Sequence, residues 1–230
     1  MSLAALEERI GYRFTDRALL RRAMAHRSFV AETDGEVSNE RLEFLGDAVL
    51  GWVVADIVFR QFTDLAEGAL TDLRKSVVNA HALADVAGQL GVGEHIMLGR
   101  GEDAANGRAK VSILSDAMEA VLGAVYLDGG YDATFGLIER LFLPRLEAAR
   151  PALHQLDRKS ALQEVAAGRA LPAPVYLLRS TGPDHDKTFY AEVRVGDEVV
   201  GRGEGRSKKA AEQVAAGIAL AELAQQAPQA

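Results

Sequence analysis

The sequence predicts an all-α domain followed by a small α+β domain with the element order αβββα. Apolar residues recur at helical spacing from Leu3 to about Ala149, with no convincing strand alternation in this part. After Pro151 the pattern changes: one helical stretch is followed by segments in which apolar and polar residues alternate. This change of period is the main reason to separate two domains.

The first domain is expected to consist of helices at residues 3–10, 16–25, 39–61, 69–90, 112–128 and 132–147. Short polar residues cap helix starts by accepting backbone hydrogen bonds, and glycine is common just beyond helix ends. The candidate caps are Asp16, Ser38 and Ser112, and the candidate stops are Gly11, Gly91 and the pair Gly129 and Gly130.

Pro151 lies where the helical spacing is interrupted, so the linker is placed at residues 150–156. We therefore expect an all-α domain over 1–149 and a second domain over 157–226. The second domain should have a helix at 158–167 and strands at 174–181, 187–195 and 198–203, with a hairpin turn at Gly196 and Asp197. An Ala-rich helix over about 207–224 closes it.

The composition is that of a soluble globular protein, with 48% hydrophobic and 26% charged residues in a chain of 230. The absence of cysteine excludes disulfides, thiolate zinc sites and thiol nucleophiles. The N-terminus lacks the pattern of a secretory signal, and Asp56 interrupts the longest apolar run. We expect a cytoplasmic protein without a membrane segment.

Three carboxylates share one stripe of the helix expected at 39–61. Measured around the axis from Glu40, Glu43 lies at about 300° and Asp47 at about 340°. The apolar residues Leu42 and Val49 lie on the opposite face. This helix is thus expected to have an apolar back and an acidic front.

The helix expected at 112–128 repeats this arrangement. Asp116 and Glu119 fall together on one face, while Met118, Val121 and Val125 gather on the other. The alternative is two ordinary amphipathic helices whose carboxylates face water, which is the commoner arrangement.

The apolar flanks of both helices favour a metal site over that alternative. Helices so apolar should be largely buried, and buried carboxylates need partners. The nearest cation in sequence is Arg41, about 100° from Glu40 on the helix. Oxygen ligands from two facing helices suit Mg²⁺, which also takes phosphate oxygens of a substrate. The pattern favours activation of a water molecule against a phosphodiester.

A basic patch precedes the last helix, although the net charge of the chain is −7. Arg202 and Arg206 lie before Ser207, which can cap the helix, and Lys208 and Lys209 stand in the first turn. Cations there oppose the helix dipole, which suggests that an external phosphate binds. Solvated surface lysines are the alternative.

The segment NERLEFLGDAVLG at 39–51 resembles the signature of the ribonuclease III family, and ILSDAMEAVLGAVYLD at 113–128 resembles the second acidic helix of that family. In the tail, KSALQE, GPDHDKTFYAEV and GEGRSKKAAEQVAA resemble a double-stranded-RNA-binding domain. The resemblance implies a homodimeric, Mg²⁺-dependent endonuclease that cuts double-stranded RNA. It would leave 5′-phosphate and 3′-hydroxyl ends with short 3′ overhangs, and it would process rRNA and mRNA precursors.

Carried over to this sequence, the resemblance implies four Mg²⁺ ligands, with Mn²⁺ as an alternative ion: Glu43, Asp47, Asp116 and Glu119. Asp47 and Glu119 would be catalytic, Glu119 being the most critical. Glu40 matches a further signature carboxylate. Glu67 occupies the position of an acidic residue near the substrate, although a carboxylate at a helix start also complements the dipole.

Phe44 and Gly46 resemble the dimer-forming part of the signature. Glycine inside a helix costs about 1 kcal/mol relative to alanine, so the close approach of another backbone is expected at Gly46, with simple core packing as the alternative. His26 also fits a family pattern, in which a structural hydrogen bond is expected.

The resemblance of the tail implies contacts with RNA from both helices and from the loop between the first two strands. Such domains read mainly the shape of A-form RNA. The implied contact residues are Gln163, Glu164, Pro183, His185, Lys208 and Lys209.

Two other functions are compatible with parts of the sequence. The protein could bind structured RNA without cutting it, but a pure binder gains nothing from buried acids. It could also act on small phosphates, with the tail as an unrelated interaction module. The combination of acidic helices and RNA-binding tail favours the endonuclease.

Overall fold

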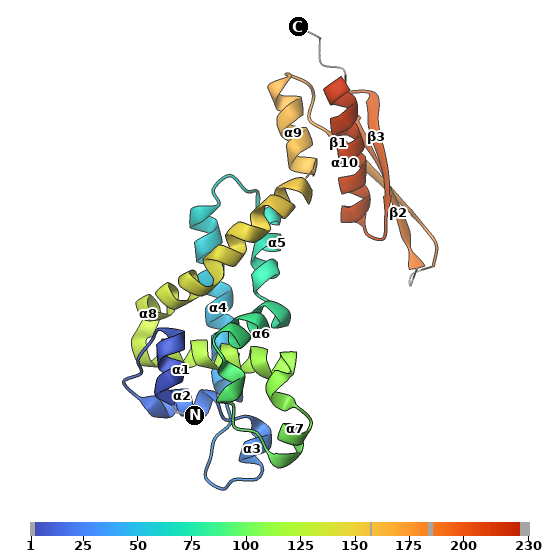
Figure 1. Cartoon of the computed structure of the whole chain (residues 1–230). Helices are drawn as coiled ribbons and strands as arrows, with labels where there is room; N and C mark the ends of the chain where they lie inside the picture. The colour runs from blue at the N-terminus through green and yellow to red at the C-terminus, as the bar shows by residue number, and fades with distance from the viewer. Residues whose placement is uncertain (1–2, 157, 184–185, 226–230) are drawn as a thin grey trace. The chain divides into compact units, whose positions relative to one another are not determined.

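The chain divides into two compact units, Met1–Arg150 and Pro151–Ala230. The computed structural model, shown in Figure 1, describes residues 3–156, 158–183 and 186–225. The division falls at Pro151, yet the backbone around it is helical, because α8 extends from Val111 to Leu156. The residues expected to link the domains, 150–156, therefore form the last turns of a helix.

The first unit is helical throughout its described residues, apart from loops and an isolated bridge between Ala25 and Met97. None of the described helices is both long enough and apolar enough to span a bilayer. The helices are α1 (Leu3–Ile10), α2 (Arg17–Ala23), α3 (Arg27–Val30), α4 (Glu40–Gln61), α5 (Glu67–Val77), α6 (Ala80–Gln89), η1 (Val92–Glu94), α7 (Arg100–Ala104), η2 (Gly107–Ala109) and α8.

Two expected helix boundaries differ from the structure. The single helix expected at 69–90 is two helices, because Asn79 caps α6 by accepting a hydrogen bond of 3.0 Å from the backbone N–H of Ala82. The break expected at Gly129 and Gly130 is a kink within α8: Gly130 has a φ of 73°, which favours glycine. Figure 1 shows the sharp turn of α8 at this point.

The expected caps are partly confirmed. Asp16 accepts a hydrogen bond of 2.9 Å from the N–H of Ala18 and caps α2. The cap position of α4 is Asn39 and not Ser38, whose hydroxyl instead donates to Glu40. Ser112 lies inside α8, which already begins at Val111.

Helices α4 and α8 cross in direct backbone contact. A Cβ atom added at Gly46 would lie 1.8 Å from the backbone oxygen of Glu119, and one added at Gly123 would lie 2.3 Å from that of Leu42. The apolar backs of both helices are buried around this crossing, as the sequence predicts. The buried residues include Leu42, Val49 and Val53 of α4 and Met118, Val121 and Val125 of α8.

The close backbone approach expected at Gly46 is present within one chain. Gly46 is buried within one chain, and the backbone that approaches it belongs to α8 of the same chain. A contact of Phe44 and Gly46 with a second copy of the chain, which the resemblance implies, stays a prediction.

The second unit is a three-stranded antiparallel sheet in the order β1-β2-β3, with helices α9 and α10. Inward-facing Gly201 and Gly203 of β3 allow α10 to approach closely: added Cβ atoms would each lie 2.3 Å from the backbone oxygens of Ala215 and Ala211, respectively. The elements are α9 (Arg158–Gly168), β1 (Val175–Thr181), β2 (Thr188–Val195), β3 (Glu198–Gly205) and α10 (Lys208–Gln225). The αβββα prediction is confirmed.

The crossing predicts that Gly46→Ala destabilises the protein. The new methyl group would overlap the carbonyl of Glu119, and overpacking of this kind typically costs roughly 1–3 kcal/mol. We expect a lower urea midpoint with an unchanged slope. Gly88→Ala in α6 is the control, because an added Cβ there meets nothing within 4 Å. Equal stability of both variants would contradict the close crossing.

Candidate metal centre and nucleic-acid interface

The start of α4 is fixed by hydrogen bonds to the end of α2 and to the residues that follow it. The N–H of Asn39 donates to the oxygen of Ala25 at 2.9 Å, and its side-chain amide donates to that of Ala23 at 3.3 Å. Asn39 is itself buried. The position of the first turn of α4, which carries Glu40 and Glu43, is thereby set from both ends: by these bonds and by the crossing at Gly46.

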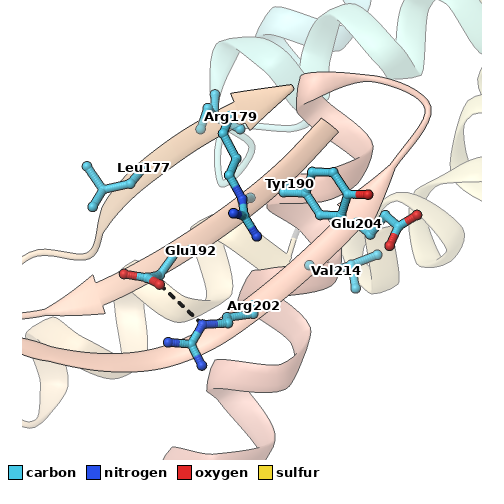
Figure 2. Close-up of a pocket in the computed structure, with 10 residues that line it drawn as sticks. Leu177, Arg179, Tyr190, Glu192, Arg202, Glu204 and Val214 are labelled. Carbon is cyan, nitrogen blue, oxygen red and sulfur yellow. Dashed lines mark hydrogen bonds and ion pairs between the residues drawn. The ribbon is translucent and has the colours of Figure 1, made fainter. Parts of the chain in front are cut away.

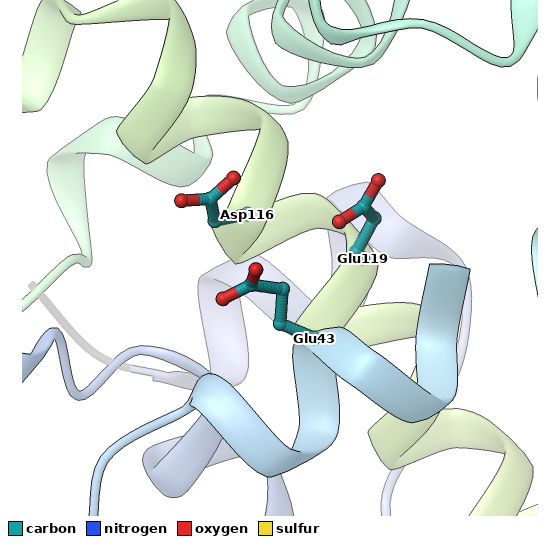
Figure 3. A group of neighbouring side chains, drawn as sticks. All are labelled: Glu43, Asp116 and Glu119. Carbon is teal, nitrogen blue, oxygen red and sulfur yellow. The ribbon is translucent and has the colours of Figure 1, made fainter. Parts of the chain in front are cut away.

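Three carboxylates converge where α4 faces α8. Glu43 extends from α4 toward Asp116 and Glu119 of α8, as Figure 3 shows. One ligand oxygen from each residue lies within 4.8 Å of the other two, and all three side chains are half-buried. We call Glu43, Asp116 and Glu119 the acidic cluster. Its members are three of the four ligands that the sequence led us to expect.

The electrostatics of the acidic cluster are unfavourable without a cation. Burial and the neighbouring charges of Asp47, Asp116 and Glu43 raise the pKa of Glu119 to about 7. The pKa of Glu43 is also raised, first by burial and then by Asp116 and Glu40. Carboxylates that are crowded in this way either bind protons or bind a cation.

Asp47, the fourth expected ligand, is exposed one turn after Glu43 and is not among the three converging carboxylates. Its charge nevertheless raises the pKa of Glu119 more than the charge of Asp116 does. Asp47 is therefore coupled electrostatically to Glu119, although it is not one of the three converging carboxylates.

Glu40 and Glu67 lie outside the acidic cluster. Glu40 is exposed, accepts a hydrogen bond of 2.7 Å from the hydroxyl of Ser38 and pairs with Arg27 at 3.9 Å. Glu67 is the exposed first residue of α5 and accepts a hydrogen bond of 3.0 Å from the hydroxyl of Thr71. Its position matches the alternative of a carboxylate at a helix start.

His26 has the structural role expected from the sequence. Its Nδ1 accepts a hydrogen bond of 3.2 Å from the backbone N–H of Ser28 and so caps α3. Burial lowers the pKa of the ring. Arg27, which follows His26, was not singled out by the sequence, since no periodic pattern relates it to the acidic helices.

The expected RNA-contact residues of the second unit are exposed where the structure describes them. Gln163 and Glu164 lie on α9, and Pro183 follows β1. Lys208 and Lys209 begin α10, where the hydroxyl of Ser207 accepts a hydrogen bond of 3.1 Å from the N–H of Ala210. His185 lies outside the described residues.

A hollow of about 730 Å³ lies elsewhere on this unit. It is lined by residues of all three strands, among them Arg179, Tyr190 and Arg202 (Figure 2). Arg202 donates to Glu192 at 3.2 Å, and the guanidinium of Arg179 lies 5.0 Å from the ring centre of Tyr190. None of the expected RNA-contact residues that the structure describes lines this hollow.

The raised pKa of Glu119 predicts a pH-dependent stability of the metal-free protein. Because the pKa of Glu119 is about 7 in the folded state and 4.5 for an ordinary glutamate side chain, the folded state binds more protons between these values. Stability therefore falls as the pH rises through this window. Glu119→Gln lacks the titrating group and should not show this loss. The unfolding free energy of Glu119→Gln minus that of the unmodified protein should therefore increase by on the order of 2 kcal/mol between pH 4.5 and pH 7.

Urea unfolding in the presence of a chelator measures this difference. Glu147→Gln, an exposed position in the same helix, is the control and should follow the unmodified protein. A constant difference between Glu119→Gln and the unmodified protein across this pH range would contradict the electrostatics described above.

Comparison with known proteins supports both units. A Ribonuclease-III-like family model matches residues 16–146, and a double-stranded RNA binding motif matches residues 159–223. Ribonuclease 3 of Thermobifida fusca is 54% identical over 86% of this chain and 82% of its own length. Ribonuclease 3 of Streptomyces coelicolor is 54% identical over 92% of this chain and 76% of its own length.

The nuclease fold is also found among solved structures. The nuclease domain of ribonuclease III from Campylobacter jejuni has a TM-score of 0.58 and 40% identity, covering 63% of this chain and 95% of that domain. With two domain matches in the predicted order and half-identical relatives over most of its length, the chain belongs to the ribonuclease III family and is an endoribonuclease for double-stranded RNA.

Proposed function

We propose that this endoribonuclease is Mg²⁺-dependent, with its catalytic domain at residues 1–149 and its RNA-binding domain at 157–226. The observation that carries the proposal is the acidic cluster: three carboxylate oxygens from two helices lie within 4.8 Å of one another. Their mutual repulsion costs stability unless a cation is bound. A cluster of this kind has no evident value for a protein that only holds RNA.

The donor set fits a hard divalent cation. Glu43, Asp116 and Glu119 offer only carboxylate oxygens, which Mg²⁺ prefers, and Mn²⁺ accepts the same ligands. Asp47, one turn after Glu43 on α4, is proposed as the fourth ligand because its charge acts on Glu119. Glu40 and Glu67 lie farther out, where they would act on the substrate or on bound water.

The chemistry proposed is hydrolysis of an RNA phosphodiester to a 5′-phosphate and a 3′-hydroxyl. A bound divalent ion would supply activation of the attacking water and stabilisation of charge on the phosphate oxygens. Glu119 and Asp116 would hold the ion from α8, and Glu43 would hold it from α4. Glu119 must lose its proton to do so, so ion binding should strengthen as the pH rises toward 7.

The second unit would place the duplex. We propose that Lys208 and Lys209 bind phosphates across a groove, while Gln163, Glu164, Pro183 and His185 contact adjacent minor grooves. Supporting this, both lysines are exposed and stand in the first turn of α10, where the helix dipole favours an anion.

We further propose that the enzyme works as a homodimer that cuts both strands and leaves short 3′ overhangs. The related nuclease domain from Campylobacter jejuni has a region involved in dimer formation. In this chain, three aromatic residues spaced along α4 are largely exposed: Phe44 (80%), Trp52 (53%) and Phe59 (72%). Several large apolar side chains exposed on one helix are typical of an interaction surface. Precursors of rRNA and mRNA in the cytoplasm are the proposed substrates.

Glu119→Gln should abolish cutting and preserve binding. Loss of the carboxylate removes an ion ligand, and we expect single-turnover cleavage of end-labelled duplex RNA in Mg²⁺ to fall on the order of a hundredfold or more, as when one stabilising group is removed from an active site. Duplex binding, measured by fluorescence anisotropy, should change little, because the proposed contacts lie in the second unit. Glu147→Gln in the same helix is the control.

The same assay separates the alternatives. Binding without cutting by the unmodified protein would indicate an RNA-holding protein. Hydrolysis of nucleotides or diphosphates in place of duplex RNA would indicate an enzyme for small phosphates. Equal loss of binding and cutting in Glu119→Gln would contradict the separate roles of the two units.

Phe44→Glu should weaken the dimer. A charge at this exposed aromatic position would have to be desolvated in the interface, so the sedimentation coefficient should shift toward the monomer value. Leu171→Glu, an exposed apolar position of the second unit, is the control. An unchanged sedimentation profile for Phe44→Glu would place the interface elsewhere.

A further inference from the structure

The backbone of Arg27 is held firmly close to the start of α4. The preceding residue, His26, donates its backbone N–H to the oxygen of Met97 at 3.1 Å. The following residue, Ser28, accepts a hydrogen bond of 2.9 Å from the N–H of Gly99 on its hydroxyl. The N–H of Asn39 binds the oxygen of Ala25 at 2.9 Å. These bonds fix the backbone of Arg27 between the segment at 97–99 and the start of α4.

The guanidinium of Arg27 lies beside the first turn of α4, the turn that also carries Glu43 of the acidic cluster. It lies 3.9 Å from Glu40 and lowers the pKa of Glu43, opposing the effects of burial and of Asp116. It also contributes to the lowered pKa of Glu102, which is caused first by a hydrogen bond from Lys110.

Stability does not explain this placement. The Arg27 side chain is 74% exposed, and its contact with Glu40 is longer than a hydrogen bond, so the pair contributes little. The amine of Lys110, in contrast to the guanidinium of Arg27, is held by a hydrogen bond, which it donates to Glu102 at 2.5 Å. In the described part of the chain, Glu40 is the one ion-pair partner of the Arg27 guanidinium, which leaves most of its N–H groups for a ligand.

We propose that Arg27 binds a backbone phosphate adjacent to the phosphate that is cleaved, on the same RNA strand. This contact would position that strand at the acidic cluster. The inference rests on the function proposed above. A strand that enters a group of carboxylates brings several phosphates, of which only the reacting one can be at the metal ion. The neighbouring phosphates need a cation, and a guanidinium binds phosphate through two parallel hydrogen bonds.

The test of this contact removes the arginine, removes the charge of one phosphate, and then removes both together. Duplexes carry one uncharged methylphosphonate at successive positions around the cleaved bond, on a nucleotide without a 2′-hydroxyl. The reference duplexes have the same sugar and an ordinary phosphate. Single-turnover kcat/KM is measured at saturating Mg²⁺ for the unmodified protein, Arg27→Ala, Arg27→Lys and Arg100→Ala.

We expect Arg27→Ala to lower kcat/KM on the ordinary duplex about tenfold, which corresponds to one hydrogen-bonded charge pair. One methylphosphonate position should cause a similar loss in the unmodified protein and little further loss in Arg27→Ala. Arg27→Lys should recover part of the activity. The log–log salt dependence of duplex binding should flatten by about one unit in Arg27→Ala.

Arg100→Ala is the matched control. Arg100 is 98% exposed and pairs with Glu32 at 3.8 Å, so it resembles Arg27 in exposure and pairing, but it is not among the described groups that shift the pKa of Glu43 or Glu119. We expect Arg100→Ala to have a kcat/KM within about twofold of that of the unmodified protein.

Two results would overturn the inference. One is equal activity of Arg27→Ala and Arg100→Ala. The other is that each methylphosphonate lowers the kcat/KM of Arg27→Ala by the same factor as that of the unmodified protein. This result would mean that the arginine acts on the carboxylates alone. If the unmodified protein failed to cut any duplex RNA, the proposed function itself would be contradicted.

Discussion

The backbone contact between α4 and α8 is the constraint on which the rest of the first unit depends. Gly46 and Gly123 let the helices approach until an added Cβ on either would overlap the backbone of the other helix. At this separation, one ligand oxygen from each of Glu43, Asp116 and Glu119 lies within 4.8 Å of the other two. The apolar backs of the two helices bury the core, and the same crossing directs their acidic fronts toward each other. Fold and candidate site therefore share one determinant.

Electrostatic repulsion is the consequence of that geometry. A carboxylate whose pKa is about 7 is a poor structural element, since its charge is disfavoured at neutral pH by burial and by its neighbours. Such an arrangement is explained by a ligand that relieves the repulsion, as a divalent cation does. Arg27 on one side of the cluster has the complementary role: its charge opposes that of the carboxylates on the side where we propose that the RNA strand enters.

Much of this could be predicted from the sequence, because it depends on periodicity. The helical spacing up to residue 149, the alternation in β2 and the common faces of Glu43 with Asp47 and of Asp116 with Glu119 are local patterns. Distances between helices are not local. The sequence therefore could not show that the backbone approaching Gly46 is that of α8. Arg27 was missed because its position depends on hydrogen bonds between its neighbours His26 and Ser28 and residues 97–99. Asn79, which divides the helix expected at 69–90, shows that one side-chain cap can outweigh a continuous apolar pattern.

The most direct test of the central claim is a crystal structure of the protein with Mn²⁺, with the anomalous scattering of the ion recorded. The account predicts an anomalous peak bonded to carboxylate oxygens of Glu43, Asp116 and Glu119, and loss of that peak in Glu119→Gln. Mn²⁺ bound only at other positions, under conditions in which the ion supports cleavage, would contradict the assignment of this cluster as the metal centre.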